Sequence, residues 1–319
     1  MHFALKRTVT AIITLFLVSV FCFLSFSVIR GDPASLVLGT SATAEQLEAL
    51  REELGLNHSI PVRYLRWLGD FFSGNWGNST RFRGEAVSSM ILERLPVSFF
   101  LALLSLFFIV LIAVPVSLLS ARRENSLISR LVGAGTAFGV SIPNFFLGVL
   151  FIWVFGISLR LFQLGVYVDY RVNFIGFIGS LCFPALAIAA PNAAIITKFL
   201  RASLFKELRG DYVRTAYSKG ADPGYVLRRH ALRNALISPI TVIGMVIAEL
   251  FSGSIVIEQV FAIPGLGRML IAAITSRDYP LIQTLVVFIA FIVIAANTLA
   301  DIAIQIIDPR IRLEGKALK

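Results

Sequence analysis

Few residues of this chain could support chemistry, and their arrangement argues against catalysis. The histidines His2, His58 and His230 are isolated, and no pair of nucleophile and general base is suggested. Cys22 and Cys182 lie inside apolar runs, without a CxxC pair or a spaced histidine. No phosphate loop ending in Gly-Lys-Ser or Gly-Lys-Thr occurs, so any ATP hydrolysis must take place on a partner. We therefore expect no catalytic residue, no metal site and no cofactor in this chain.

One carboxylate is notable for its position. Glu249 lies midway along an apolar run, where an ionised carboxylate facing lipid would cost on the order of a few kcal/mol. The neighbouring Ala248, Ser252 and Gly253 are small and would admit a close helix or a water-filled path. Two interpretations stay open. The carboxyl group is hydrogen-bonded to a neighbouring helix, or Glu249 and Ser252 lie on a solute pathway and attract a cationic group.

The composition identifies a lipid bilayer as the solvent of this chain. Its 319 residues are 57% apolar and 15% charged, and the mean hydropathy is +0.81, whereas a soluble domain is usually just under half apolar. Runs long enough to cross about 30 Å of hydrocarbon lie near 9–29, 97–119, 132–158, 176–197, 236–257 and 281–304. The predicted fold class is all-α, a polytopic membrane protein with about six transmembrane helices.

The charged residues predict the orientation of these helices. The net charge of +10 could indicate nucleic acid, but the basic residues are confined to loops between apolar runs and lack interleaved aromatic residues. With the N-terminus inside, 18 of the 29 Lys and Arg residues lie on the inner side, as the positive-inside rule requires. We expect both termini in the cytoplasm, a lipid bilayer around the chain and no nucleic-acid partner.

Four segments follow from this topology. Residues 1–29 form the N-terminus and a retained first helix, since the apolar run is longer than that of a signal peptide and no cleavage site precedes Gly31-Asp32-Pro33. Residues 30–96 face outward and contain a short helix up to Gly55, which opens with a capping box of Thr43 and Gln46. Residues 97–307 form the transmembrane core, with a cytoplasmic loop at 198–235, and 308–319 form a cytoplasmic tail.

Two smaller patterns have ordinary explanations. Gly135 and Gly139 have the GxxxG spacing of packed membrane helices. An aromatic cluster in the outer segment either lies at the membrane interface or binds a partner; it consists of Trp67, Phe71, Phe72 and Trp76.

The cytoplasmic loop is too patterned for a simple linker. Its first half is expected to continue the fourth span and to end near Gly220, which can adopt the left-handed conformation of a helix end. Asp222 then caps a second helix that begins at Pro223. The basic residues of the loop need no explanation beyond topology. A corner of small residues between two capped helices, however, suits a knob that docks into a groove of a partner.

This loop resembles the EAA loop of ABC importer permeases, in the form found in the dipeptide, oligopeptide and nickel branch. Arg214-Thr215-Ala216 stands where the motif has Glu-Ala-Ala, Gly220 is its glycine, and His230-Ala231-Leu232-Arg233 takes the later Ile-x-Leu-Pro position. Arg214 and Arg233 depart from the motif in the manner of that branch. Further similar stretches cover nearly the whole chain: PVRYLRWL at 61–68, ERLP at 93–96, SIPNFFLG at 141–148, IVIEQVFAIPGLGRML at 255–270, SRDYP at 276–280 and Asp308-Pro309-Arg310.

The resemblance implies a type I ABC importer permease fold in the bacterial inner membrane. It also implies a second homologous permease subunit, two ATPase subunits that bind ATP and Mg²⁺ and dock on the 198–235 loop, and an outer solute-binding protein. Peptides are the expected solute, with nickel or a metal chelate as the alternative. An ion-gradient transporter would often show internal repeats and paired acids near the midplane, and no convincing repeat is seen.

Overall fold

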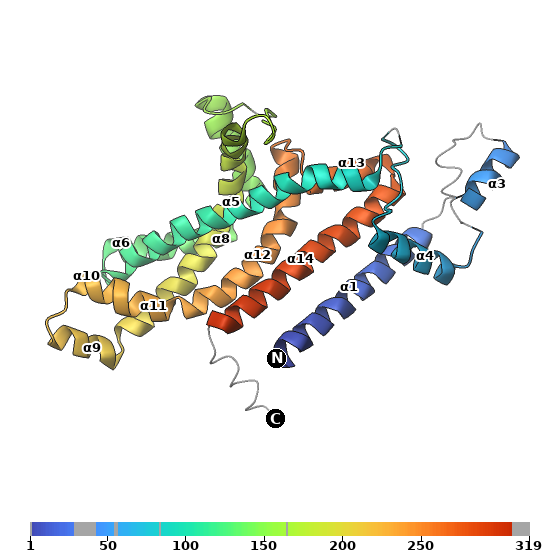
Figure 1. Cartoon of the computed structure of the whole chain (residues 1–319). Coiled ribbons are helices and arrows are strands. Elements are labelled where there is room, and N and C mark those ends of the chain that lie inside the picture. Colours follow the sequence, from blue (N-terminus) through green and yellow to red (C-terminus); the bar gives the residue numbers. More distant parts are fainter. Residues whose placement is uncertain (1, 29–42, 54–56, 83, 164, 308–319) are drawn as a thin grey trace. The chain divides into compact units, whose positions relative to one another are not determined.

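The computed structural model describes residues 2–28, 43–53, 57–82, 84–163 and 165–307 (Figure 1). This part is helical, and its only β-structure is an isolated bridge between Asn78 and Ala86. Three expected features lie outside the described residues: the turn at Gly31-Asp32-Pro33, the end of the outer helix at Gly55, and the tail 308–319.

The expected fold class is confirmed. Within the described residues five helices are long and apolar enough to cross a membrane, and a bent pair of helices brings the number to as many as six. The five long helices are α1 (His2–Val28), α5 (Val87–Ala121), α8 (Phe174–Leu208), α12 (Ile237–Val260) and α14 (Tyr279–Ile307). Three shorter helices are α3 (Ala44–Glu53), α4 (Ile60–Ser73) and α13 (Leu266–Ser276).

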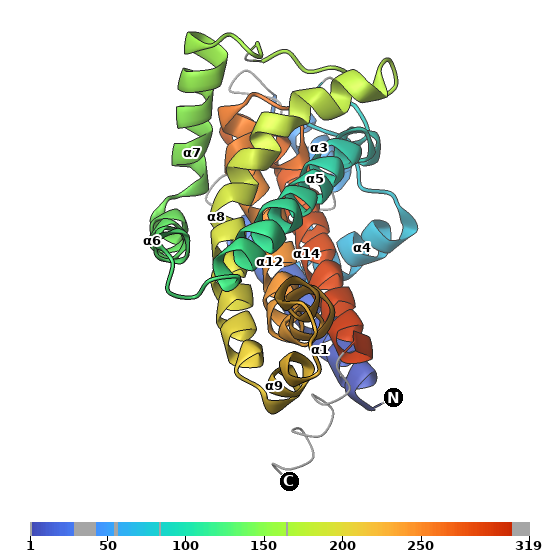
Figure 2. The ribbon, with the colours of Figure 1, turned by 90° about the vertical axis from the view of Figure 1, so that its left-hand side faces the viewer.

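The third predicted span, 132–158, is not a single helix. It consists of α6 (Leu127–Ser141) and α7 (Asn144–Phe151), which runs on into the π-helix η1 (Ile152–Ser158), and the two parts are bent by 101° (Figure 2). Pro143 explains the break, because proline disfavours helical geometry at the preceding residue, and Ile142 is extended at φ −89° and ψ 124°. The 15 residues of α6 span only about 22 Å, less than the hydrocarbon core.

The contacts divide the chain into two compact units, and each has its own apolar core. The first unit comprises residues 1–96 and 265–294, and the second comprises residues 97–264 and 295–319. Val87, Ile91, Leu281 and Leu285 are among the buried residues of the first core. The larger core of the second unit includes Phe177, Leu181, Ile188, Leu250 and Ile257.

In the first unit, aromatic rings join α4 and the segment that follows it to neighbouring helices. The ring of Trp67 lies 5.9 Å from that of Phe23 on α1, and Trp76 lies 5.3 Å from Phe288 on α14. Phe71 stacks on Trp76 at 5.6 Å, whereas Phe72 is 76% exposed. Most of the predicted aromatic cluster therefore packs helices together.

The predicted capping box of α3 is also confirmed by hydrogen bonds in both directions between residues 43 and 46.

In the second unit, α8 is the central helix and contacts α6, α7 and α12 (Figure 2). Close approach of α6 and α8 depends on Gly139, because a Cβ at that position would lie 2.8 Å from the Cβ of Ala194. Gly135 has no neighbouring atom within 4 Å of a Cβ position. Of the two glycines in the GxxxG spacing, Gly139 therefore lies at the contact between α6 and α8, and Gly135 does not.

Candidate functional site

The cytoplasmic loop forms a corner whose first arm differs from the prediction. The fourth span does not continue to Gly220. Helix α8 ends at Leu208, and α9 (Asp211–Ser218) begins after an extended residue, Gly210, at φ −69° and ψ 148°. A Cβ on Gly210 would lie 2.9 Å from the ring of Tyr212 and 3.1 Å from the carbonyl of Glu207. The Gly-Asp pair at 210–211 is a helix-boundary signal that could have revealed this break.

The end of α9 is as predicted. Gly220 has a φ of +80°, its N–H donates to the carbonyl of Tyr217 at 2.9 Å, and the N–H of Ala221 donates to the carbonyl of Ala216 at 3.1 Å. These two bonds are the Schellman pattern of a helix that ends in a left-handed residue. Gly220 therefore fixes the point at which the chain turns.

The second arm begins as predicted. The carboxylate of Asp222 accepts a 3.0 Å bond from the N–H of Tyr225, and Pro223 is the first helical residue. The arm consists of α10 (Pro223–Tyr225), the π-helix η2 (Val226–Ala231) and α11 (Leu232–Ala235). Through Leu236 it leads directly into α12. The corner is therefore linked by backbone to both α8 and α12.

The predicted coupling residues of the first arm fall on two faces of α9. Arg214 and Thr215 are exposed, and Arg214 pairs only loosely with Asp211, at 3.9 Å. Ala216 is half-buried, and Val213 beside it is fully buried. Gly220 is exposed at the turn. Of the predicted triplet, Arg214 and Thr215 are thus free to meet a partner, whereas Ala216 faces the rest of the corner.

The predicted residues of the second arm divide in the same way. His230 and Arg233 are exposed, and the ring of His230 lies 5.6 Å from that of Tyr225. Ala231 is fully buried and Leu232 is half-buried, both in an apolar cluster under the corner. That cluster also contains Ala121, Leu200, Leu204, Leu227 and Ala235. The corner therefore rests on the ends of α5 and α8, and Figures 1 and 2 show α9 at that end of α8.

Polar contacts tie the corner to its surroundings, and sequence reasoning missed them. The hydroxyl of Tyr212 donates to a carboxylate oxygen of Glu207 at 2.6 Å, and Arg209 pairs with Glu124 at 2.6 Å. Burial raises the pKa of the Tyr212 phenol above its ordinary value, and the hydrogen bond to Glu207 raises it further. Tyr212 therefore stays protonated, and a hydrogen-bond donor, at neutral pH.

The candidate pathway residues lie on an exposed face of α12. Glu249 and Ser252 are both exposed, and the hydroxyl of Ser252 donates to the carbonyl of Glu249 at 3.2 Å. Val246 and Leu250 are buried in the core of the second unit. Within this chain Glu249 is therefore not buried against a neighbouring helix, and its carboxylate is directed toward whatever covers this face.

A second acid of α12 was not singled out from the sequence. Glu258 is 0% exposed, and its carboxylate accepts a 2.6 Å hydrogen bond from the hydroxyl of Ser98 on α5. Its position near the end of an apolar run was the available signal. Glu258 joins α12 to α5 inside the second unit.

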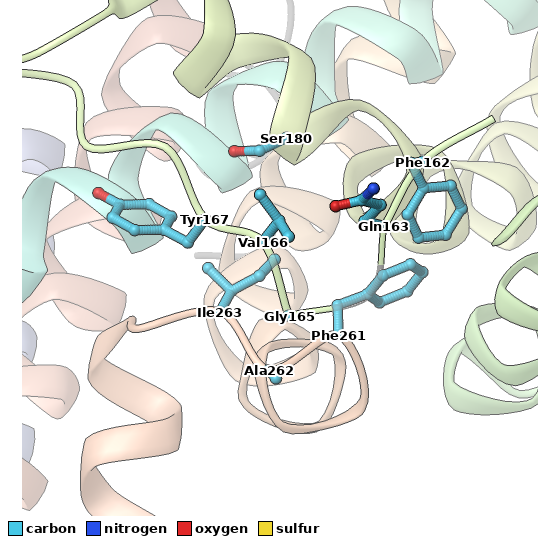
Figure 3. Close-up of a pocket in the computed structure, with 9 residues that line it drawn as sticks. All are labelled: Phe162, Gln163, Gly165, Val166, Tyr167, Ser180, Phe261, Ala262 and Ile263. Carbon is cyan, nitrogen blue, oxygen red and sulfur yellow. The ribbon is translucent and has the colours of Figure 1, made fainter. Parts of the chain in front are cut away.

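A small cavity lies near the other end of the second unit (Figure 3). Its lining comes from the 162–167 loop, from Ser180 on α8 and from the turn at 261–263 after α12. The cavity measures about 20 Å³, which is room for one water molecule. It is therefore too small to be a solute site.

Comparison with known proteins agrees with this architecture. Residues 113–313 match the family described as binding-protein-dependent transport system inner membrane component, and residues 1–102 match the N-terminal part of such membrane components. The chain is 36% identical over 310 residues to a probable peptide ABC transporter permease protein, y4tP, of Sinorhizobium fredii, covering 97% of this chain and 99% of the relative.

Two relatives from other bacteria cover the chain equally well. The oligopeptide transport system permease protein AppB of Bacillus subtilis is 35% identical over 311 residues, covering 97% of this chain and 98% of the relative. The dipeptide transport system permease protein DppB of Lactococcus lactis is 33% identical over 311 residues, covering 98% of this chain and 99% of the relative. With its apolar helices and the full-length similarity to permeases, the chain belongs to the family of binding-protein-dependent transport system inner membrane components.

Proposed function

We propose that this chain is one of two permease subunits of an ATP-driven importer of dipeptides or oligopeptides. The observation that carries the proposal is the similarity over nearly the full length to permeases named for peptide transport. The second permease subunit is a homologous chain, and an outer solute-binding protein delivers the peptide. Both termini and the 198–235 loop face the cytoplasm, and residues 30–96 face outward.

The exposed corner supports the coupling part of the proposal. Arg214, Thr215 and Gly220 on the α9 side, with His230 and Arg233 on the second arm, form the docking surface for an ATPase subunit. Ala216, Ala231 and Leu232 pack beneath this surface and keep its shape. ATP and Mg²⁺ bind on the two ATPase subunits, and the permease supplies no catalytic group.

The exposed face of α12 supports the pathway part. An acid in the middle of an apolar helix is stabilised by water or by a polar partner rather than by lipid. Glu249 and Ser252 therefore line the peptide pathway, where the carboxylate attracts the amino terminus of the peptide.

Reconstitution tests the proposal. The permease pair, the ATPase subunits and the solute-binding protein in proteoliposomes should take up a labelled dipeptide only with ATP and with the binding protein. Uptake driven by an ion gradient without ATP would refute the importer class. Uptake of nickel in place of the dipeptide would leave the importer class intact and would identify nickel as the solute.

A further inference from the structure

The docking helix α9 is held by few contacts of its own. It has eight residues between an extended joint at Gly210 and a left-handed joint at Gly220. A helix this short is not stable alone in water, so its position depends on contacts with the rest of the chain. Val213 is its one fully buried residue within the described part. Ala216 adds a half-buried contact, so the apolar contacts of this helix are few.

Tyr212 supplies a further contact, between α9 and the end of α8. Its hydroxyl donates to the carboxylate of Glu207, on the last turn of α8, at 2.6 Å. This hydroxyl therefore ties the first turn of α9 to the last turn of α8.

The local backbone is arranged to permit this bridge. The ring of Tyr212 lies against the backbone of Gly210, where a Cβ would come within 2.9 Å of a ring carbon. Any larger residue at position 210 would displace the ring and with it the hydroxyl. The extended joint and the tyrosine therefore act as a pair.

We propose that Tyr212 is a positioning residue that fixes α9 to the last turn of α8, so that movement of α9 by the ATPase is transmitted to α8. This inference rests on the proposed docking of α9. Transmission of a movement requires a rigid element with defined arrangements. Without the phenol hydroxyl, α9 still docks, but it moves relative to α8, and ATP hydrolysis is no longer fully matched to movement of α8.

The same geometry separates this role from a role in folding. Tyr212 is 40% exposed, and a hydrogen bond at such a site contributes little to global stability because water competes for both partners. Loss of the hydroxyl should therefore leave expression, assembly and thermal stability of the complex unchanged.

The test is Tyr212→Phe in the complete transporter in proteoliposomes, with uptake of a labelled dipeptide and ATP hydrolysis measured together. We expect normal amounts of bound ATPase subunits, normal basal ATP hydrolysis, and a fall in dipeptide taken up per ATP of roughly twofold, the low end of what one hydrogen bond carries. The matched control is Tyr225→Phe on the second arm, whose hydroxyl makes no hydrogen bond within the described residues. It should behave as wild type.

Variants of Glu207 identify the bond itself. Glu207→Gln keeps a carbonyl acceptor for the phenol and should transport nearly normally, whereas Glu207→Ala should match Tyr212→Phe. The double variant, Tyr212→Phe with Glu207→Ala, should be no worse than either single change, because both remove the same interaction. Additive losses would contradict the bridge.

Two outcomes overturn the inference, and crosslinking separates them from failure of the proposed docking. Ser218→Cys on the exposed face of α9 should crosslink to an ATPase subunit. If this crosslink forms and Tyr212→Phe leaves uptake per ATP unchanged, the positioning role alone is refuted. It is also refuted if Tyr212→Phe releases the ATPase subunits, since Tyr212 then belongs to the docking surface. If no crosslink forms in the otherwise unaltered transporter, the docking proposal itself fails.

Discussion

The hydroxyl of Ser79 donates a hydrogen bond to the carboxylate of Asp278, although the two residues are 199 positions apart. Thr80 adds bonds from its N–H and its hydroxyl to the other carboxylate oxygen, both at 3.3 Å. That oxygen also accepts a 3.4 Å bond from the N–H of Leu281, in the first turn of α14. The buried carboxylate of Asp278 therefore holds the turn after α4 against the start of α14 inside the first unit.

The bonds from Ser79 and Thr80 to Asp278, called the clamp below, can be tested separately from the cap that Asp278 provides for α14. Asparagine caps helices about as well as aspartate, but Asp278→Asn replaces one acceptor oxygen with a donor that faces other donors. We expect Asp278→Asn and Ser79→Ala each to destabilise the protein by about 1–3 kcal/mol, as for a lost hydrogen bond to a charged group. Thermal unfolding of the purified complex measures this. Ser89→Ala is the control, because within the described residues that exposed hydroxyl bonds only to the carbonyl of Ala86. An unfolding temperature of Asp278→Asn equal to that of wild type would contradict the clamp.

Substitution of Gly220 tests the corner by conformation alone. A Cβ at Gly220 meets no atom within 4 Å, so any effect comes from its φ of +80°. Valine is strained there by roughly 1–3 kcal/mol, whereas asparagine tolerates the left-handed region. We expect Gly220→Val to lose most ATP-driven uptake and Gly220→Asn to keep most of it. Normal assembly, uptake and ATP hydrolysis in the valine variant would rule out a docking role.

Glu249 is tested by removing its charge. Glu249→Gln keeps the size of the side chain and removes the charge that would attract a peptide amino terminus. We expect uptake of a dipeptide with a free amino terminus to fall about tenfold, the effect of one contact worth about 1.4 kcal/mol. Assembly and basal ATP hydrolysis should not change, and a dipeptide blocked at its amino terminus should not respond to the substitution. Equal uptake of the free dipeptide by both proteins would remove Glu249 from the pathway.

The orientation of the chain is tested by labelling with a membrane-impermeant maleimide. Cys22 is buried and Cys182 is half-buried, and both are replaced by alanine in the background. In intact cells Glu45→Cys on α3 should be labelled, and Lys219→Cys at the end of α9 should be labelled only after the membrane is opened. Labelling of position 219 from outside would show that the proposed orientation is wrong.

The sequence by itself determined the features that depend on local chemistry. The apolar runs predicted the transmembrane helices, because a chain in lipid must satisfy its backbone hydrogen bonds within each helix. The capping box at Thr43, the left-handed turn at Gly220 and the cap at Asp222 were equally predictable. Each of these features involves residues within a few positions of one another. The break at Gly210 belongs to the same class, and it was missed because the apolar run before it favoured a continuous helix.

Only the tertiary structure decided which of these residues meet others. It placed Ala216 and Ala231 beneath the corner and left Arg214 and His230 exposed, and it turned Glu249 away from the core. It also brought Ser79 to Asp278 and Ser98 to Glu258. These relationships depend on how helices far apart in the sequence pack against one another. Hydropathy and spacing within one helix show which residues share a face, and the face that becomes buried is chosen by packing against the other helices.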